Sequence, residues 1–127
     1  MAKQKKQWGE ATLGLRAAIQ RTQELEHSPA IFQTSSFVFA SAEDAAAVFT
    51  GDKAGNVYSR FTNPTVQAFE RRLAVLEGGE SCIATASGMA AILTTALVFL
   101  KQGVHLLASR TLFGTTIAAL RPAPKTP

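Results

Sequence analysis

The stretch from residue 81 to residue 108 constrains the fold more than any other part of the chain. Residues 81–85 and 104–108 are short apolar runs typical of buried strands, and residues 89–101 form a helical pattern that is apolar nearly all round. Strand, helix and strand with short connections predict a βαβ unit, with parallel strands and a right-handed crossover. A helix with so little polar surface must be covered on several sides. We therefore expect an α/β fold that is incomplete in this chain.

Two more helices are predicted from their end signals. Ser41, with an acid at Asp44, is a typical helix start, and Gly51 is a typical helix end. Asn63–Pro64 predicts the start of a second helix, which the Gly78–Gly79 pair ends. The apolar residues of this second helix recur on one face, which is expected to be buried.

The first part of the chain is predicted to be an arm that contributes no core. Residues 1 to about 30 are polar with little periodicity, and residues 11–16 are expected to be extended or irregular. Residues 31–39 are rich in β-branched and aromatic side chains, which predicts an extended segment lying on another part of the protein.

The charge of the chain gives no sign of a nucleic-acid partner. The net charge is +4, from 13 Lys+Arg and 9 Asp+Glu, and much of the excess is a basic tail at Lys3, Lys5 and Lys6. No basic stripe with interleaved aromatic residues follows this tail, so we expect the tail to be solvated.

Hydropathy and the few cysteines and histidines exclude several other classes. The longest apolar stretch, residues 88–100, is shorter than the about 20 residues of a transmembrane helix, and no secretory signal follows the basic start. We expect a soluble cytoplasmic protein with no membrane partner. The single Cys82 excludes a disulfide framework and is expected to be a buried apolar residue. His27 and His105 lack metal-ligand spacing, so no metal is expected.

The turn Ser87-Gly88-Met89 is a candidate anion site. It leads from a predicted strand end into a helix start, where free backbone N–H groups and the helix dipole favour a phosphate. Gly88 lets a phosphate approach the backbone, and Ser87 offers a hydroxyl. A plainer alternative stays open at this point, in which Ser87 is only a helix cap and Gly88 only a turn glycine.

Two further candidates are side chains in loops. Tyr58 and Arg60 point the same way if their loop is extended, and a guanidinium with a phenol suits a phosphate. Phe113 follows the second predicted strand, where an aromatic ring can stack on a planar ligand. The alternatives are a surface pair at positions 58 and 60 and a core aromatic before a helix at position 113.

Taken together, these segments resemble the pyridoxal-phosphate enzymes of cysteine and methionine metabolism, which include cystathionine γ-synthase, cystathionine lyases and homoserine-ester sulfhydrylases. The resemblance runs from about residue 11 to residue 116. Its specific pieces, in order, are Thr34-Ser35-Ser36-Phe37, Tyr58-Ser59-Arg60-Phe61-Thr62-Asn63-Pro64-Thr65, Leu76-Glu77-Gly78, Thr85-Ala86-Ser87-Gly88-Met89-Ala90-Ala91-Ile92 and Phe113-Gly114-Thr115-Thr116. Within the family the chain most resembles the sulfhydrylases of O-succinylhomoserine, since Phe113 stands where many relatives have tyrosine.

The resemblance implies the fold and the layout of the chain. The fold is that of a fold-type I pyridoxal-phosphate transferase, of which this chain would hold the N-terminal arm and the first βαβ part of the large domain. Residues 1–62 are expected to be the arm and a cofactor-contacting loop, and residues 63–120 the start of the cofactor-binding large domain. Residues 121–127 are expected to be an aberrant proline-rich tail. Members of the family are homo-oligomers, tetramers built from dimers, that act on small molecules.

The resemblance also implies roles for the candidate residues around one cofactor. Gly88 and Met89 would donate backbone N–H groups to the phosphate of pyridoxal 5′-phosphate, with Ser87 beside them. Phe113 would stack on the cofactor ring.

The resemblance assigns the remaining two candidates, Tyr58 and Arg60, to the cofactor of a neighbouring protomer. Tyr58 and Arg60 would bind the phosphate of that protomer's cofactor. The implied reaction is γ-replacement, in which succinate leaves O-succinylhomoserine and sulfide adds, giving homocysteine for methionine biosynthesis. The alternatives are a cystathionine γ-synthase or lyase of the same family, and a non-catalytic phosphate-binding or interaction domain.

The catalytic residues that the resemblance implies are missing from the chain. Such an enzyme needs a lysine for the Schiff base, an acid on the pyridine nitrogen and an arginine for the substrate carboxylate, which the family carries beyond the Phe-Gly segment. The lysines of this chain are Lys3, Lys5, Lys6, Lys53, Lys101 and Lys125, and none stands in the family's lysine context. Val104 and Ala18 also depart from the family pattern, which commonly has Asp and Gly there. We therefore expect no catalytic residue, a truncated product that is inactive alone, and an isolated chain that is aggregation-prone or molten.

Overall fold

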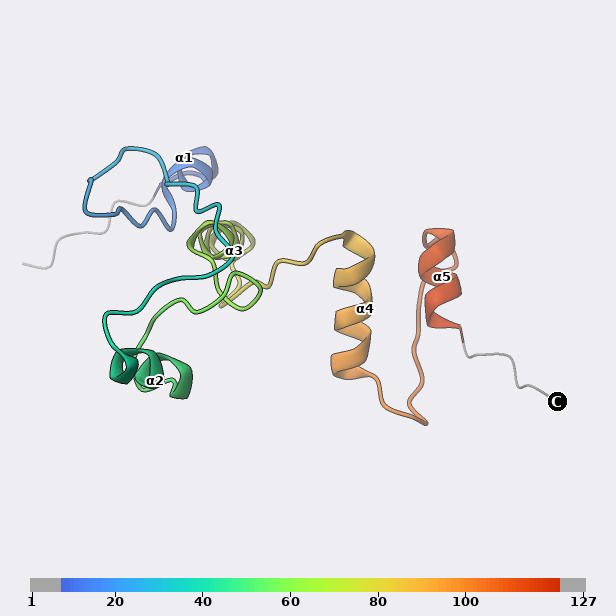
Figure 1. Ribbon diagram of the computed structural model, residues 1–127. Coiled ribbons are helices and arrows are strands. Elements are labelled where there is room, and N and C mark those ends of the chain that lie inside the picture. Colours follow the sequence, from blue (N-terminus) through green and yellow to red (C-terminus); the bar gives the residue numbers. More distant parts are fainter. Residues whose placement is uncertain (1–7, 122–127) are drawn as a thin grey trace, which may run out of the picture. The chain divides into compact units, whose positions relative to one another are not determined.

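The computed structural model describes residues 8–121, which form two compact units on either side of the Ile83–Ala84 junction. The helices are α1 (Glu10–Arg16), α2 (Ala42–Thr50) and α3 (Pro64–Glu77) in the first unit, and α4 (Gly88–Phe99) and α5 (Gly114–Leu120) in the second (Figure 1). None of the helices in this described range is long and apolar enough to cross a membrane. The predicted basic tail at Lys3, Lys5 and Lys6 and the prolines of residues 122–127 lie outside the described residues.

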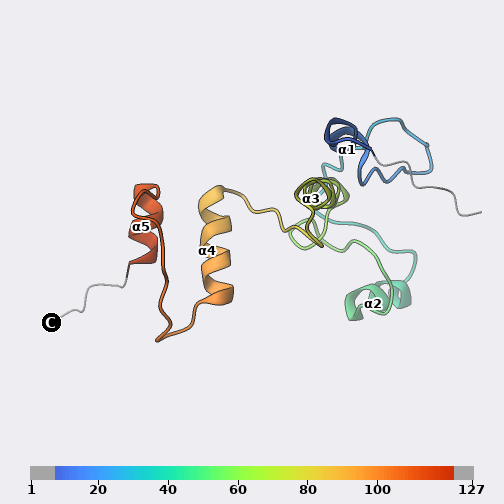
Figure 2. The same ribbon diagram turned by 180° about the vertical axis from the view of Figure 1, so that it is seen from behind.

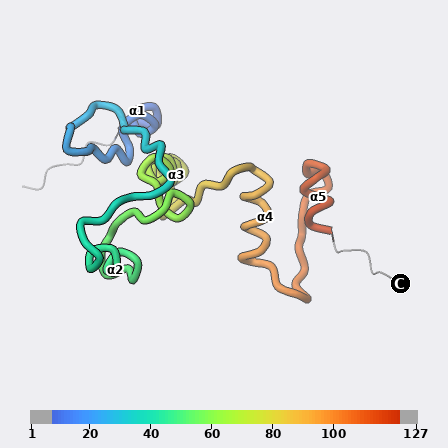
Figure 3. Tube along the Cα trace, viewed as in Figure 1, coloured from blue at the N-terminus to red at the C-terminus, as the bar shows by residue number. Residues whose placement is uncertain are grey.

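The N-terminal part of the first unit is a helix that packs on α3, which corrects the expectation of an irregular arm at residues 11–16 (Figure 3). Arg72 Nε on α3 donates a hydrogen bond to the carbonyl oxygen of Ala17, at 3.3 Å. Ala17 itself is buried. The helix α1 is short and no side chain caps its start, so the local sequence gives little sign of it. Packing on α3 stabilises it instead.

α2 and α3 begin and end where their signals predict. The Ser41 hydroxyl accepts the Asp44 N–H at 3.1 Å, and Gly51 ends α2 with a φ of 84°. α3 begins at Pro64, and Gly78 ends it with a φ of 66°. Glycine adopts this left-handed backbone without the steric cost of a Cβ, so the two helix ends are fixed by local sequence.

Residues 31–39, the predicted extended segment, contain no helix or turn and lie along the loop that leads from α2 to α3 (Figure 1), which agrees with the expectation of a segment that lies on another part of the protein. The Ser59 N–H donates to the Ser35 carbonyl oxygen at 2.9 Å. Next to this bond, Ser36 and Tyr58 form an isolated antiparallel bridge. The loop that carries Tyr58 is therefore attached to the extended segment by backbone hydrogen bonds.

In the second unit, α4 and α5 lie side by side with their N-termini at the same end (Figure 2). The Ser87 hydroxyl caps α4 by accepting the Ala90 N–H at 3.1 Å. α4 ends at Phe99, slightly before the predicted end at Lys101, with Leu100 as its C-cap. The predicted apolar helix is therefore confirmed, with a shift at its C-terminal end.

The predicted βαβ unit does not form in the described residues, which contain helices and an isolated bridge but no strand. Residues 81–85 and 104–108 are not paired with each other. Parallel strands occur inside larger sheets that are covered on both faces, and two strands alone are marginally stable at best. Cys82 is accordingly half-buried and lies outside any strand, so its predicted place in a buried strand is wrong. The crossover helix forms without the strands because its Ser87 cap is a local interaction.

Candidate functional site

The N-terminus of α4 presents backbone donors without protein partners. In the part of the chain that the structure describes, the N–H groups of Gly88 and Met89 donate to no protein acceptor, whereas the Ala90 N–H donates to Ser87 Oγ. A Cβ built on Gly88 would meet nothing within 4 Å, so the backbone is open at this point. Ser87 Oγ accepts one hydrogen bond and keeps its own proton for another partner. An anion suits such a helix start.

Phe113 lies at the start of α5, as its N-cap residue, and is 74% exposed. The hydroxyls of Thr115 and Thr116 each lie 3.6 Å from the Met89 sulfur atom. These contacts join the start of α5 to the start of α4. Phe113 and the turn at residues 87–89 therefore belong to the same end of one helix pair (Figure 2).

Tyr58 and Arg60 belong to the first unit and contact each other. The guanidinium carbon of Arg60 is 5.0 Å from the centre of the Tyr58 ring and 5.0 Å from that of Phe61. The loop is a turn rather than an extended segment, because the N–H groups of Phe61 and Thr62 both donate to the Tyr58 carbonyl oxygen, at 2.9 and 3.0 Å. The two predicted side chains therefore meet by stacking of the guanidinium on the ring. Within the described residues, Arg60 forms no ion pair with a carboxylate.

Asn63 holds this loop in place, a role that the sequence analysis missed beyond the helix cap. Its side chain is buried, 6% exposed. Its Oδ1 accepts the Thr65 N–H at 2.9 Å. Its Nδ2 donates to the Phe32 carbonyl oxygen at 3.0 Å and to Ser59 Oγ at 2.9 Å. One side chain thus ties the extended segment, the Tyr58 loop and the start of α3 together.

Carboxylates outside the candidate site have lowered pKa values. The hydrogen bond from Lys53, with that from the Ala40 N–H, lowers the pKa of the Asp44 carboxyl. The N–H and hydroxyl of Thr22 lower the pKa of the Glu26 carboxyl. Neither carboxylate is one of the predicted site residues. No cluster of His, Cys, Asp and Glu within the described range could hold a metal ion.

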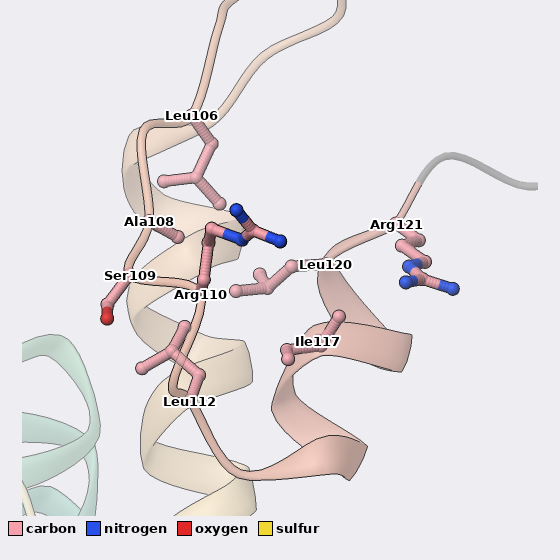
Figure 4. Close-up of a pocket in the computed structure, with 8 residues that line it drawn as sticks. All are labelled: Leu106, Ala108, Ser109, Arg110, Leu112, Ile117, Leu120 and Arg121. Carbon is pink, nitrogen blue, oxygen red and sulfur yellow. The ribbon is translucent and has the colours of Figure 1, made fainter.

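A hollow of about 360 Å³ also lies in the second unit (Figure 4). Its walls combine aliphatic side chains with two guanidinium groups, and they are formed by Leu106, Ala108, Ser109, Arg110, Leu112, Ile117, Leu120 and Arg121. Neither the turn at residues 87–89 nor Phe113 lines this hollow, so it is separate from the candidate phosphate site.

Residues 11–125 match the family described as Cys/Met metabolism PLP-dependent enzymes. The chain belongs to this family. It is 56% identical over 107 residues to the O-succinylhomoserine sulfhydrylase of Pseudomonas aeruginosa, a match that covers 84% of this chain and 27% of the relative. It is 47% identical over 92 residues to the L-methionine gamma-lyase of Pseudomonas putida, over 72% of this chain and 23% of that relative. The chain therefore spans about a quarter of the length of the curated relatives it matches.

A solved protein structure is similar to this chain as well. A Campylobacter jejuni protein described as an O-acetylhomoserine (thiol)-lyase matches with a TM-score of 0.66 and 38% identity, over 72% of this chain and 22% of that chain. That structure carries N′-pyridoxyl-lysine-5′-monophosphate. The family and the pyridoxal-phosphate cofactor expected from the sequence are thus confirmed. The similarity is consistent with the expected fold-type I architecture, although the described part of this chain forms no strand.

Proposed function

We propose that this chain is the N-terminal part of a pyridoxal-phosphate-dependent homoserine-ester sulfhydrylase. In the proposed reaction, sulfide replaces the succinate group of O-succinylhomoserine, which gives homocysteine for methionine biosynthesis. The 56% identity to the Pseudomonas aeruginosa sulfhydrylase over 84% of this chain supports this proposal.

The proposed layout follows from the family. Residues 1–62 would form the arm and a cofactor-contacting loop, and residues 63–120 the start of the large domain. The Ile83–Ala84 junction between the two compact units lies within this proposed large domain.

The observation that carries the proposal is the pair of unpartnered N–H groups at Gly88 and Met89. A phosphate dianion would accept hydrogen bonds from both and would lie at the positive end of the α4 dipole. Ser87 would add its hydroxyl proton. The exposed ring of Phe113 offers a flat apolar face for a pyridine ring. When bound, pyridoxal phosphate acts as an electron sink for bond changes on the substrate.

We assign Tyr58 and Arg60 to the cofactor phosphate of a neighbouring protomer in a homo-oligomer. The guanidinium of Arg60 is a planar fork of donors that suits phosphate oxygens, and no carboxylate of the described residues competes for it. Its stacking on the rings of Tyr58 and Phe61 limits its orientations, which reduces the entropy lost on binding. The Tyr58 hydroxyl would add a further donor.

A proline at position 88 tests the phosphate site. Gly88 is the first residue of α4, where proline fits a helix, and Ser87 already has the extended backbone that precedes proline, with φ −161° and ψ 160°. Gly88→Pro therefore removes one N–H donor and keeps the helix. We expect it to weaken the binding of inorganic phosphate and of pyridoxal phosphate by about tenfold or more, the effect of one hydrogen bond to a charged group. Phosphorus NMR measures this binding.

The matched control is the same change at the start of another helix. Ala42 is the first residue of α2, and Ser41 before it is extended in the same way, with φ −153° and ψ 173°. Ala42→Pro is expected to leave phosphate binding unchanged. Equal phosphate binding by the wild type and by Gly88→Pro would contradict the proposed site.

A hybrid enzyme tests the proposed reaction. Residues 11–116 of this chain replace the matching segment of the Pseudomonas aeruginosa sulfhydrylase, and homocysteine formation from O-succinylhomoserine and sulfide is measured. We expect the hybrid to be active. Arg60→Ala in the hybrid should raise the cofactor concentration needed for half-maximal activity by about tenfold, through loss of a charged phosphate contact. The control Arg71→Ala changes an exposed arginine of α3 and should leave this cofactor concentration unchanged. A hybrid that binds the cofactor like its parent and forms no homocysteine would refute the proposed reaction.

A further inference from the structure

The side chain of Met89 is held by two hydroxyl groups from the first turn of α5. Thr115 Oγ1 and Thr116 Oγ1 each lie 3.6 Å from its sulfur atom. In these contacts the hydroxyls donate and the thioether sulfur accepts. Thr116 is buried, 5% exposed, and across the described residues its hydroxyl has no other partner than Met89. A buried hydroxyl that depends on a weak acceptor makes that acceptor important for the local structure.

Thr116 connects Met89 to Phe113. Its hydroxyl donates to the Met89 sulfur, and its backbone N–H donates to the Phe113 carbonyl oxygen at 2.9 Å. Met89 also contributes one of the unpartnered N–H groups at the start of α4. The same short network therefore reaches the proposed phosphate donors at one end and the proposed ring platform at the other.

We propose that the thioether of Met89 is a positioning residue that fixes Phe113 relative to the phosphate-binding turn at residues 87–89. The proposal rests on the proposed cofactor site and adds a role for the Met89 side chain, which acts through Thr115 and Thr116. A leucine at this position fills a similar volume but accepts no hydrogen bond, so it leaves the buried Thr116 hydroxyl unpaired. Because this unpaired hydroxyl is unfavourable, the start of α5 is expected to shift, and Phe113 is expected to shift with it.

The proposal is tested by substitutions at positions 115 and 116 that remove the hydroxyl groups and keep the shape of the side chains, or keep the hydroxyl groups and change the shape. Thr115→Val with Thr116→Val (the valine pair) removes both hydroxyls and keeps both shapes. Thr115→Ser with Thr116→Ser (the serine pair) keeps both hydroxyls. Thr95→Val is the control, because the Thr95 hydroxyl donates to the Ala91 carbonyl oxygen on α4, at 2.9 Å.

The first measurement uses the full chain without any ligand. The chain has 2 methionines, so a carbon-13 methyl-methionine NMR spectrum assigns Met89 directly. We expect the Met89 methyl and Phe113 ring resonances of the serine pair and of Thr95→Val to match the wild type. In the valine pair, the Met89 resonance should move toward that of a freely rotating methionine, and the Phe113 resonances should shift with it. Unchanged Met89 or Phe113 resonances in the valine pair would overturn the proposal.

The second measurement separates the cofactor ring from the phosphate. Circular dichroism in the pyridoxal-phosphate absorption band reports a ring held in one orientation, and phosphorus NMR reports phosphate binding. We expect the valine pair to lose most of the dichroism, because the ring platform is no longer held in one orientation. Phosphate affinity should change by no more than about twofold, because α4 and its backbone N–H groups remain in place. The serine pair should restore the dichroism.

The possible failures are distinguishable. Wild-type dichroism in the valine pair, or an equal loss of dichroism and phosphate affinity, would overturn the positioning role. A wild-type chain that binds no phosphate would instead contradict the proposed function. In that case, the Met89 and Phe113 resonances of the ligand-free chain still decide whether Met89 positions Phe113.

Discussion

At the scale of single residues, Ala18 adopts an unusual backbone just after the end of α1. Its φ is 58°, in the left-handed region. A residue with a Cβ is destabilised there by about 1–2 kcal/mol, and helix ends of this kind usually carry glycine. The family pattern commonly has glycine at this position, and the backbone gives a physical reason for it. Ala18 therefore strains the chain next to the buried Ala17, where α1 meets Arg72 of α3.

A glycine at position 18 is predicted to relieve this strain. Ala18→Gly is expected to stabilise the first unit by about 1 kcal/mol, because it removes the Cβ from a left-handed position. Ala46→Gly is the matched control in the middle of α2, and it is expected to destabilise by about 1 kcal/mol through lower helix propensity. Amide hydrogen exchange of α1 and α3 measures the first effect and that of α2 the second. Faster exchange of α1 in Ala18→Gly would contradict the interpretation.

At the scale of helices and loops, one buried amide connects the elements that carry Tyr58 and Arg60. The Asn63 side chain caps α3, and its two N–H groups hold the extended segment and the loop. An amide is needed for this, because one end must accept a hydrogen bond and the other must donate two. The geometry of the Tyr58–Arg60 pair thus depends on a residue that would not itself contact a ligand.

Asn63→Ala is therefore expected to destabilise the attachment of the extended segment and the Tyr58 loop to the start of α3. The loss of the helix cap costs about 1 kcal/mol, and the Phe32 carbonyl left without its donor adds about 1–3 kcal/mol. Asn63→Ser keeps a capping oxygen and removes the amide N–H donors, so its loss of stability should be intermediate. Hydrogen exchange at the Ser59 and Thr65 amides measures the effect. Equal exchange in the alanine and serine variants would show that the cap contributes nothing.

The elements also show which parts of the fold local sequence can predict. α2, α3 and the start of α4 were predictable because Ser41, Asn63 and Ser87 cap them through bonds to residues two or three positions away. α1 lacks such a signal and is stabilised by α3, so its existence depends on distant residues. The predicted strands depend even more on distant partners, and they do not form in the described residues.

The same distinction applies to the candidate site. The turn at residues 87–89 was recognisable because a glycine after a serine cap leaves open N–H groups within three residues. The contact of Met89 with Thr115 and Thr116 could not be recognised from the sequence, because it joins positions that are 26 and 27 residues apart. Tyr58 and Arg60 were expected to point the same way from an extended loop, whereas the structure has a turn there, with the Arg60 guanidinium over the Tyr58 ring. The family resemblance supplied the roles, and these stay predictions until ligand binding is measured.

At the scale of the whole molecule, many large apolar side chains remain exposed. On α4, Leu97 is 73% exposed and Phe99 is 75% exposed. The buried apolar residues in the described range are Ala17 and Ala74, both small. Apolar burial contributes about 25 cal/mol per Å² and is the main favourable term in folding. With so little of it, the chain has a small driving force to offset the conformational entropy that folding loses.

We therefore expect the isolated chain to self-associate through the apolar surface of α4 and to bind a hydrophobic dye. Leu97→Glu with Phe99→Glu should reduce dye fluorescence and self-association, because two charges would interrupt this surface. Leu15→Glu on α1 is the control, since Leu15 is similarly exposed but lies on the short helix of the first unit. Dye binding and analytical ultracentrifugation over a range of concentrations measure the two effects. A wild-type chain that is monomeric, binds no dye and melts in one sharp transition would mean that the helices bury far more apolar surface in solution than the structure shows.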